Sequence, residues 1–98
     1  MDKFFELNST TFVWDDEKAR KNEVSHSGVT FEHAAHVFFD PFLRILDASR
    51  NLERRDAVIG FDTKSRLLFV VHIQVDTEYI RIISARKATT QERNEYDS

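Results

Sequence analysis

Residues 67–85 read LLFVVHIQVDTEYIRIISA, and this stretch decides the fold class. Leu67–Val75 is rich in the branched and aromatic side chains that favour strands, and Tyr79–Ala85 repeats the pattern. The polar residues between them, Asp76–Glu78, predict a tight turn, so the two strands form an antiparallel hairpin. Because Phe69–Ile73 is apolar at nearly every position, we expect a central strand that is covered on both faces, or covered by a partner on one of them.

Two helices are predicted in the N-terminal half. The first follows a short apolar strand at Phe12–Trp14, is capped by Asp15 or Asp16 and ends near Val24, before the helix-breaking Gly28. The second is capped by Thr30 and stops before Asp40-Pro41, and apolar residues recur along it at helical spacing.

The remaining pattern is a meander followed by a short helix. Strands are expected at residues 42–47 and 57–61, with a turn at 62–65 before the long hairpin, and a polar helix ends near Tyr96. The order is β-α-α-β-β-β-β-α. It predicts an α+β fold in which two N-terminal helices pack on an antiparallel sheet of four or five strands, with a C-terminal helix.

Length and composition limit the function classes. With 98 residues we expect one domain, residues 1–98, small enough for a partner to stabilise it. The absence of cysteine excludes disulfides, thiolate metal sites and thiol nucleophiles. No signal-peptide pattern and no long apolar run occur, so we expect a soluble cytoplasmic protein without a membrane partner.

The net charge of −3 conceals an uneven distribution. Residues 1–53 carry six basic and ten acidic groups, whereas residues 54–93 carry eight basic and five acidic groups. A cation-rich segment of this kind is a weak indication of a phosphate ligand.

Several blocks of the chain resemble one known family. They are WDDEKARKN at 14–22, HSGVTFEHAA at 26–35, VFFDP at 37–41, Arg55 with Ile59-Gly60, RLL and VVH at 66–72, and IRIISARKAT at 80–89, followed by Glu92-Arg93 and Tyr96. In order and spacing they resemble the BrnT family of ribonuclease toxins over roughly residues 12–96. One departure occurs at Ser25-His26-Ser27-Gly28, where the family usually has Lys-His-Gly. The chain has one extra residue there and lacks the lysine.

The resemblance implies a RelE-like fold and an activity. It implies RNA cleavage that arrests translation, and neutralisation by a cognate antitoxin with a ribbon-helix-helix DNA-binding segment. The toxin–antitoxin complex would repress its own operon, so the toxin would meet operator DNA only through the antitoxin.

Metal-free RNA cleavage needs a group that accepts the 2′-hydroxyl proton, cations around the phosphorane, and an acid for the departing 5′-oxygen. The candidate catalytic residues are His26, Arg55, Arg81 and Arg86, and the candidate RNA-binding residues are Lys64, Arg66 and Lys87. The role of Arg81 rests on the family motif, since an exposed strand arginine is otherwise common. His26 is equally explained by favourable interaction with a helix end.

The candidate arginines are expected to converge. Arg55 begins the strand that precedes the central strand, and Arg81 lies on the strand that follows it. Arg86 comes at the end of that later strand. All three side chains can therefore face one phosphate-binding surface, with His26 near it. His33 and His36 are spaced as a helical pair but have no third ligand, so we expect no metal and no cofactor.

A second function class remains open. A non-catalytic interaction module could bind a partner protein through its sheet and its basic segment. A metal-dependent enzyme is disfavoured because no set of ligands is spaced for it.

Overall fold

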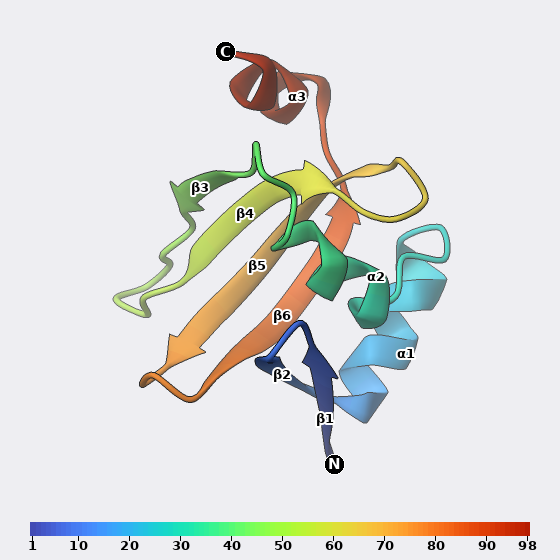
Figure 1. Ribbon diagram of the computed structural model, residues 1–98, viewed down its shortest axis with the longest axis vertical. Helices are drawn as coiled ribbons and strands as arrows, with labels where there is room; N and C mark the ends of the chain where they lie inside the picture. Colours follow the sequence, from blue (N-terminus) through green and yellow to red (C-terminus); the bar gives the residue numbers. More distant parts are fainter.

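The computed structural model describes all 98 residues and contains one six-stranded sheet with three helices (Figure 1). In chain order the elements are β1 (Asp2–Leu7), β2 (Thr10–Asp15), α1 (Asp16–Ser25), α2 (Phe31–Val37), β3 (Arg44–Asp47), β4 (Asp56–Phe61), β5 (Leu67–Val75), β6 (Tyr79–Lys87) and α3 (Thr90–Asp97). The strand order across the sheet is β1-β2-β6-β5-β4-β3. No helix is long and apolar enough to cross a membrane.

The hairpin of β5 and β6 lies at the centre of the sheet, and the predicted α+β class is confirmed. β5 pairs antiparallel with β4 and with β6, and a bulge interrupts its register with β6 beside Val71 and His72. The bulge is the reason that side chains alternate differently in the two halves of β6.

Two details of the sheet differ from the prediction. β1 is an additional strand, joined to β2 through Asn8 and Ser9, whose φ angles of 50° and 64° suit a tight hairpin turn. β2 pairs with β6 in parallel, so the sheet is mixed rather than purely antiparallel. Ser9 is an uncommon residue at positive φ, which weakened the turn signal, and the direction in which remote strands pair is not encoded in the local pattern.

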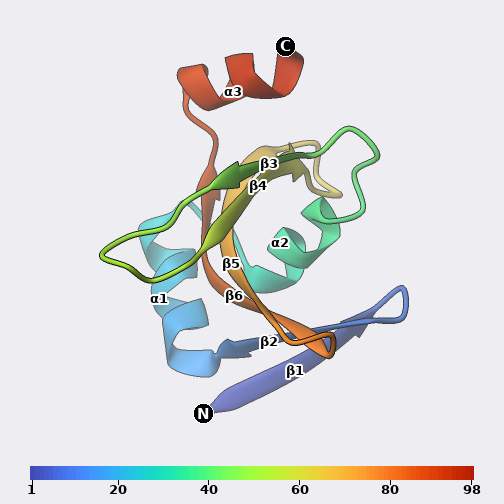
Figure 2. The same ribbon diagram turned by 90° about the vertical axis from the view of Figure 1, so that its left-hand side faces the viewer.

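The sheet curves around α2, which covers its concave face (Figure 2). The core between them contains Phe12, Trp14, Phe31, Ala34, Ala35, Val58, Leu68, Val70 and Ile82. α2 approaches β4 closely at Gly60, where an added Cβ would lie 2.9 Å from Cγ1 of Val37. The opposite face of the sheet is not covered by α2, and there β5 exposes Phe69, Val71 and Ile73 partially.

α1 runs alongside β6, where β2 no longer pairs with it (Figure 1). Asn22 fills the gap: its side-chain amide donates to the Ala85 carbonyl at 2.8 Å and to the Val29 carbonyl at 3.1 Å, and its oxygen accepts the Ala85 N–H at 3.1 Å. Asn22 is buried, so this amide takes the place of a neighbouring strand. Its role in the predicted motif is therefore structural.

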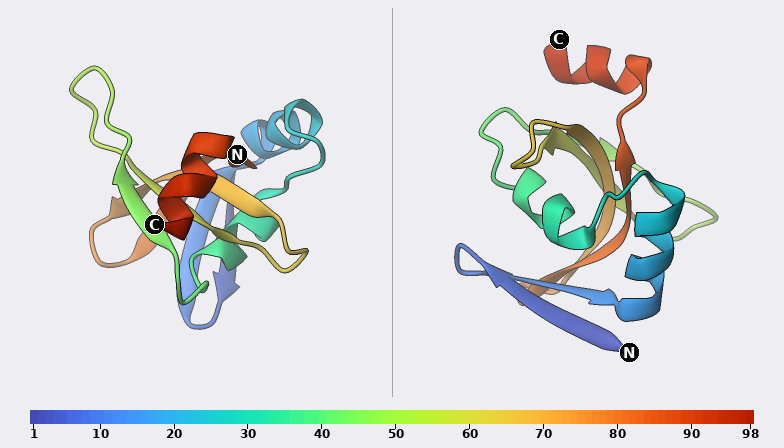
Figure 3. Two further views of the ribbon diagram at one scale, coloured as in Figure 1. Left: turned by 90° about the horizontal axis from the view of Figure 1, so that it is seen from above. Right: turned by 90° about the vertical axis from the view of Figure 1, so that its right-hand side faces the viewer.

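α3 stands at one end of the sheet and contains no buried residue (Figure 3). Thr89 and Glu92 form a capping box at its start. Tyr96 donates a hydrogen bond of 2.7 Å to Asp40 and its ring packs edge-on against Phe61. Asp40 also accepts the backbone N–H groups of Phe42 and Phe61, so this carboxylate ties together the end of α2, the end of β4 and α3.

Candidate functional site: an arginine-lined cavity on the open sheet face

A cavity of about 470 Å³ opens on the sheet face opposite α2. Its lining comes from the β3–β4 connection, β5 and β6: Ala48, Ser49, Arg50, Arg55, Phe69, Val71, Ser84 and Arg86. The register explains the grouping, because Phe69 lies opposite Arg86 and Val71 opposite Ser84, so these four side chains share one face. Two of the predicted arginines, Arg55 and Arg86, therefore lie in one cavity.

Arg86 is held on three sides. Its guanidinium donates to both oxygens of Glu92, at 2.7 and 2.9 Å, and to the Lys87 carbonyl at 3.3 Å. The guanidinium carbon lies 4.4 Å from the centroid of the Phe69 ring. Burial would raise the pKa of Glu92, but the hydrogen bonds from Arg86 and Thr89 hold this pKa below its usual value. The same pair raises the pKa of Arg86.

Arg55 is held mainly through its backbone. The Ser49 hydroxyl accepts its N–H at 3.3 Å, and its carbonyl accepts the Ala48 N–H at 2.9 Å. Its Nη2 donates to Glu53 at 2.9 Å, but Glu53 is 67% exposed. The Nε–H of Arg55 is buried and has no hydrogen-bond partner. A buried charged donor without an acceptor is costly. The Arg55 side chain as a whole is 30% exposed and lines the cavity, where its only carboxylate partner is the exposed Glu53.

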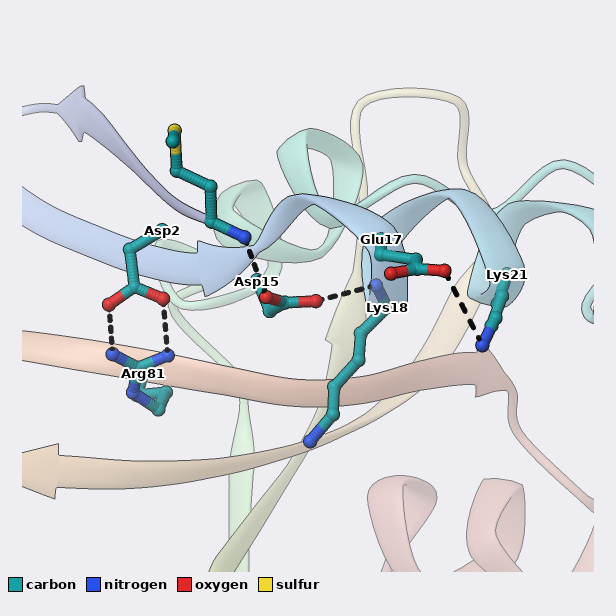
Figure 4. A network of polar contacts seen from close by, with 7 residues as sticks. Asp2, Asp15, Glu17, Lys18, Lys21 and Arg81 are labelled. Atoms are coloured by element: carbon teal, nitrogen blue, oxygen red, sulfur yellow. Dashed lines mark hydrogen bonds and ion pairs between the residues drawn. The ribbon is translucent and has the colours of Figure 1, made fainter.

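Arg81 lies on the same sheet face but outside the cavity lining. It is the cross-strand neighbour of Ile73, and Ile73 shares a smaller cavity with Arg55, so Arg55 and Arg81 lie on either side of this residue. Its guanidinium donates to both oxygens of Asp2, at 3.2 and 2.7 Å (Figure 4). This hydrogen bond raises the pKa of Arg81 and lowers that of Asp2.

The β1–β2 hairpin brings Asp2 to this position. Asp2 pairs in register with Asp15, the residue that caps α1 by accepting the Lys18 N–H at 3.0 Å. Figure 4 shows the two carboxylates on neighbouring strands, one facing Arg81 and the other facing α1.

The other predicted residues lie away from the cavity lining. His26 is the residue at the C-terminal end of α1, and its backbone N–H donates to the Asn22 carbonyl. Lys87 ends β6 and is exposed. Lys64 and Arg66 belong to the β4–β5 turn, where the Asp62 carboxylate accepts both backbone N–H groups at 2.9 Å.

Arg66 is a structural residue in this geometry. Its Nε donates to Asp62 at 2.8 Å and its Nη2 lies 2.9 Å from Nδ1 of His33 on α2. The Asp62 side chain is fully buried. Burial would raise the pKa of Asp62, but the bonds from Arg66 and the turn backbone hold it below the usual value. Burial, and then Arg66, lowers the pKa of His33.

His72 is buried in the core rather than in the cavity. Its ring packs edge-on against Phe38, with centroids 4.8 Å apart, and its Nδ1 has no hydrogen-bond partner. Burial lowers the pKa of His72, so the ring favours the neutral form. No group of three or more histidine and carboxylate side chains is arranged to hold a metal ion.

Comparisons with known proteins identify the family and the fold. A family model described as the ribonuclease toxin, BrnT, of type II toxin–antitoxin systems matches residues 14–92. The chain belongs to the BrnT family. Its fold is similar to the crystal structure of the Brucella abortus ribonuclease toxin BrnT, with a TM-score of 0.62 and 23% identity over 79% of this chain and 94% of that one. A search of curated proteins found no match.

Membership in the BrnT family implies an antitoxin partner, since the family is defined by type II toxin–antitoxin systems. The three predicted arginines lie within the matched segment, whereas Asp2, which pairs with Arg81, lies outside it. The partner carboxylate of Arg81 thus comes from a part of the chain that the BrnT match does not include.

Sequence reasoning missed six residues of the cavity: Ala48, Ser49, Arg50, Phe69, Val71 and Ser84. Ser84 lies two positions before Arg86, so strand alternation places these two side chains on one face. Phe69 joins them because the bulge shifts the pairing of β5 with β6 by one residue, which the local pattern does not encode. Ser49 and Arg50 lie in an irregular connection without any pattern, so their position depends on how the β3–β4 hairpin folds back.

Proposed function

We propose that this BrnT family member is a metal-independent endoribonuclease that cleaves RNA at the Arg55–Arg86 cavity and thereby inhibits translation. The observation that carries the proposal is a cavity lined by three arginines, of which Arg55 is paired only with the exposed Glu53. A phosphate oxygen takes the place of that carboxylate on the Arg55 guanidinium, and charge-assisted bonds of that kind are strong.

The RNA itself supplies the nucleophile in this proposal. Its 2′-oxygen attacks the adjacent phosphorus, a base takes the 2′-hydroxyl proton, and the 5′-oxygen leaves with a proton. The guanidinium of Arg55 stabilises the negative charge that accumulates on the phosphorane, and the positive charge of Arg86 adds to the electrostatic field in the same cavity. Arg81 extends the cationic face beyond Ile73, and Lys64, Arg66 and Lys87 remain proposed contributors to the field around the RNA.

His26 is the proposed proton-transfer residue. Asn22 binds Ala85, next to Arg86, and His26 lies one helical turn further along α1, about 6 Å along the axis. The proposal therefore needs the RNA to pass over the β6 end, from the cavity toward α1.

The antitoxin is proposed to be a ribbon-helix-helix protein, with the toxin contacting operator DNA only through it. We place this toxin in the cytoplasm, where its RNA substrate is found. The second candidate function, a non-catalytic interaction module, is favoured by one observation: Phe69, Val71 and Ile73 form a partly exposed apolar row on the open sheet face. Such a row suits a protein partner as well as RNA.

Purified protein incubated with single-stranded RNA and a chelator tests the activity. We expect cleavage by the native chain, and about a hundredfold slower cleavage by Arg55→Ala, by analogy with removal of one oxyanion-hole donor. Arg20→Ala is the matched control, since Arg20 is an exposed arginine on α1. Cleavage that stops with chelator contradicts metal independence, and no cleavage at any condition favours the interaction module.

A further inference from the structure

The guanidinium of Arg86 presents an unusual surface to the cavity. Three of its five N–H donors are already used, two by Glu92 and one by the Lys87 carbonyl. These bonds use both Nη1 hydrogens and one Nη2 hydrogen, so the Nη1–Nη2 edge of the guanidinium is already paired with the Glu92 carboxylate. Only the Nε–H and the second Nη2–H of Arg86 remain for a phosphate.

The flat face of the same group remains available. Phe69 covers one face at 4.4 Å, yet the Arg86 side chain keeps 36% of its exposure and lines the cavity. Glu92 fixes the plane, because a carboxylate bound through both oxygens prevents the guanidinium from rotating. The result is a rigid, cationic, planar surface layered on an aromatic ring.

Unpaired nucleobases bind surfaces of this kind. Bases that are released from a helix stack on aromatic rings and on arginine planes, and this stacking tolerates any base because each has a π-face. Arg55 complements the platform, because its guanidinium lines the same cavity and its one carboxylate partner, Glu53, is exposed and can be replaced by a phosphate oxygen.

We infer that Arg86, layered on Phe69, is a stacking platform for one unpaired nucleobase, while Arg55 binds a neighbouring phosphate. The inference rests on the proposed RNA cleavage at this cavity and names its substrate class as single-stranded RNA with a base turned out of the stack. Glu92 is a positioning residue that keeps the platform flat.

Binding of 2′-O-methyl oligonucleotides tests the inference without cleavage, because the nucleophilic 2′-oxygen is blocked. A single-stranded eight-nucleotide series carries one abasic nucleotide at each position in turn, and affinity is measured for the native protein, Phe69→Leu and Arg86→Lys. Phe69→Leu keeps an apolar side chain and Arg86→Lys keeps the charge, and both remove the planar group. Tyr79→Leu is the control for Phe69→Leu, since Tyr79 is an aromatic residue on another strand, β6, and packs against Phe4. Arg20→Lys is the control for the second.

We expect one abasic position to weaken binding by the native protein about tenfold. Phe69→Leu and Arg86→Lys should bind the intact strand about tenfold more weakly and show no further loss with the abasic strand, whereas the two controls should behave like the native protein. Thermal melting checks that each variant is folded, and Arg86→Lys carries the test if Phe69→Leu is not.

Two results would overturn the platform while leaving RNA cleavage intact. Native-like binding by Arg86→Lys would show that Arg86 acts as a point charge on phosphate, and an abasic penalty that persists in both variants would place the base elsewhere. If the native protein neither binds nor cleaves RNA, the proposed function fails first, and the platform fails with it.

Discussion

Two arginine–carboxylate groups on opposite sides of the sheet differ in how many of their charged atoms have hydrogen-bond partners within the chain. At the β4–β5 turn, the buried Asp62 carboxylate accepts bonds from Arg66 and from two backbone N–H groups, and Arg66 also reaches His33. In the cavity, Arg55 is paired with the exposed Glu53 and keeps one buried N–H without a partner. The first group is complete within the chain, and the second is not.

The difference separates a structural arginine from a ligand-binding one. A buried ion pair with all its bonds filled cannot accept a ligand without losing its own partners. An arginine with an exposed carboxylate can exchange that partner for a phosphate at small cost, because exposed pairs contribute little. Both arginines occur in segments that resemble the BrnT family, so the resemblance alone does not distinguish them.

Asp62→Asn should give the largest effect, a loss of about 3 kcal/mol in the free energy of unfolding, since removing one member of a buried pair leaves the other charge uncompensated. The change keeps the side-chain shape. Urea unfolding of the variant and the native protein measures it. A loss below about 1 kcal/mol would mean that the turn is held by its backbone bonds alone.

Much of the fold was predictable because its signals are local. Helical spacing, the Asp15 and Thr30 caps and the apolar run of β5 are each encoded within a few residues. The side-chain partners of the arginines were not, because Asp2 reaches Arg81 across 79 positions and His33 reaches Arg66 across 33. These contacts between residues far apart in the sequence decide whether the N–H donors of an arginine have partners within the chain.

Arg81 is the intermediate case, with an exposed partner but no buried donor that lacks one. We expect Arg81→Ala to abolish toxicity on induction in cells, with RNA cleavage slower by about a hundredfold, because a cation on the sheet face beside the cavity is lost. Binding of the cognate antitoxin and the melting temperature should be retained.

Asp2→Asn is the control for this experiment. It breaks the ion pair but leaves the Arg81 charge, so cleavage should remain at least at the native rate. If both variants lose activity equally, the pair acts by holding β1 in place. Full toxicity of folded Arg81→Ala would remove Arg81 from the site.

The buried His72 and the half-buried His33 predict a pH dependence of stability. Burial lowers the pKa of His72 and of His33 below the ordinary value of 6.5. As the pH falls below that value, the unfolded chain binds protons that the folded chain does not, so stability decreases until the folded-state pKa values are reached. Denaturant unfolding between pH 8 and about pH 5 measures the slope. His72→Phe should flatten it, and an unchanged slope would assign the effect to other groups.

Glu53→Gln should have the smallest effect and probes the exchangeable partner of Arg55. Glu53 is 67% exposed, so its removal should leave the unfolding free energy unchanged, in contrast to the matched amide substitution Asp62→Asn. Because the carboxylate competes with phosphate for the Arg55 guanidinium, we expect affinity for 2′-O-methyl RNA to rise by about threefold, and the gain to disappear at high salt. Loss of affinity would instead show that Glu53 orients Arg55 for the RNA. In that case both Arg66 and Arg55 would depend on their carboxylate partners. The unpaired Nε–H of Arg55 would then be the one remaining difference between the two groups.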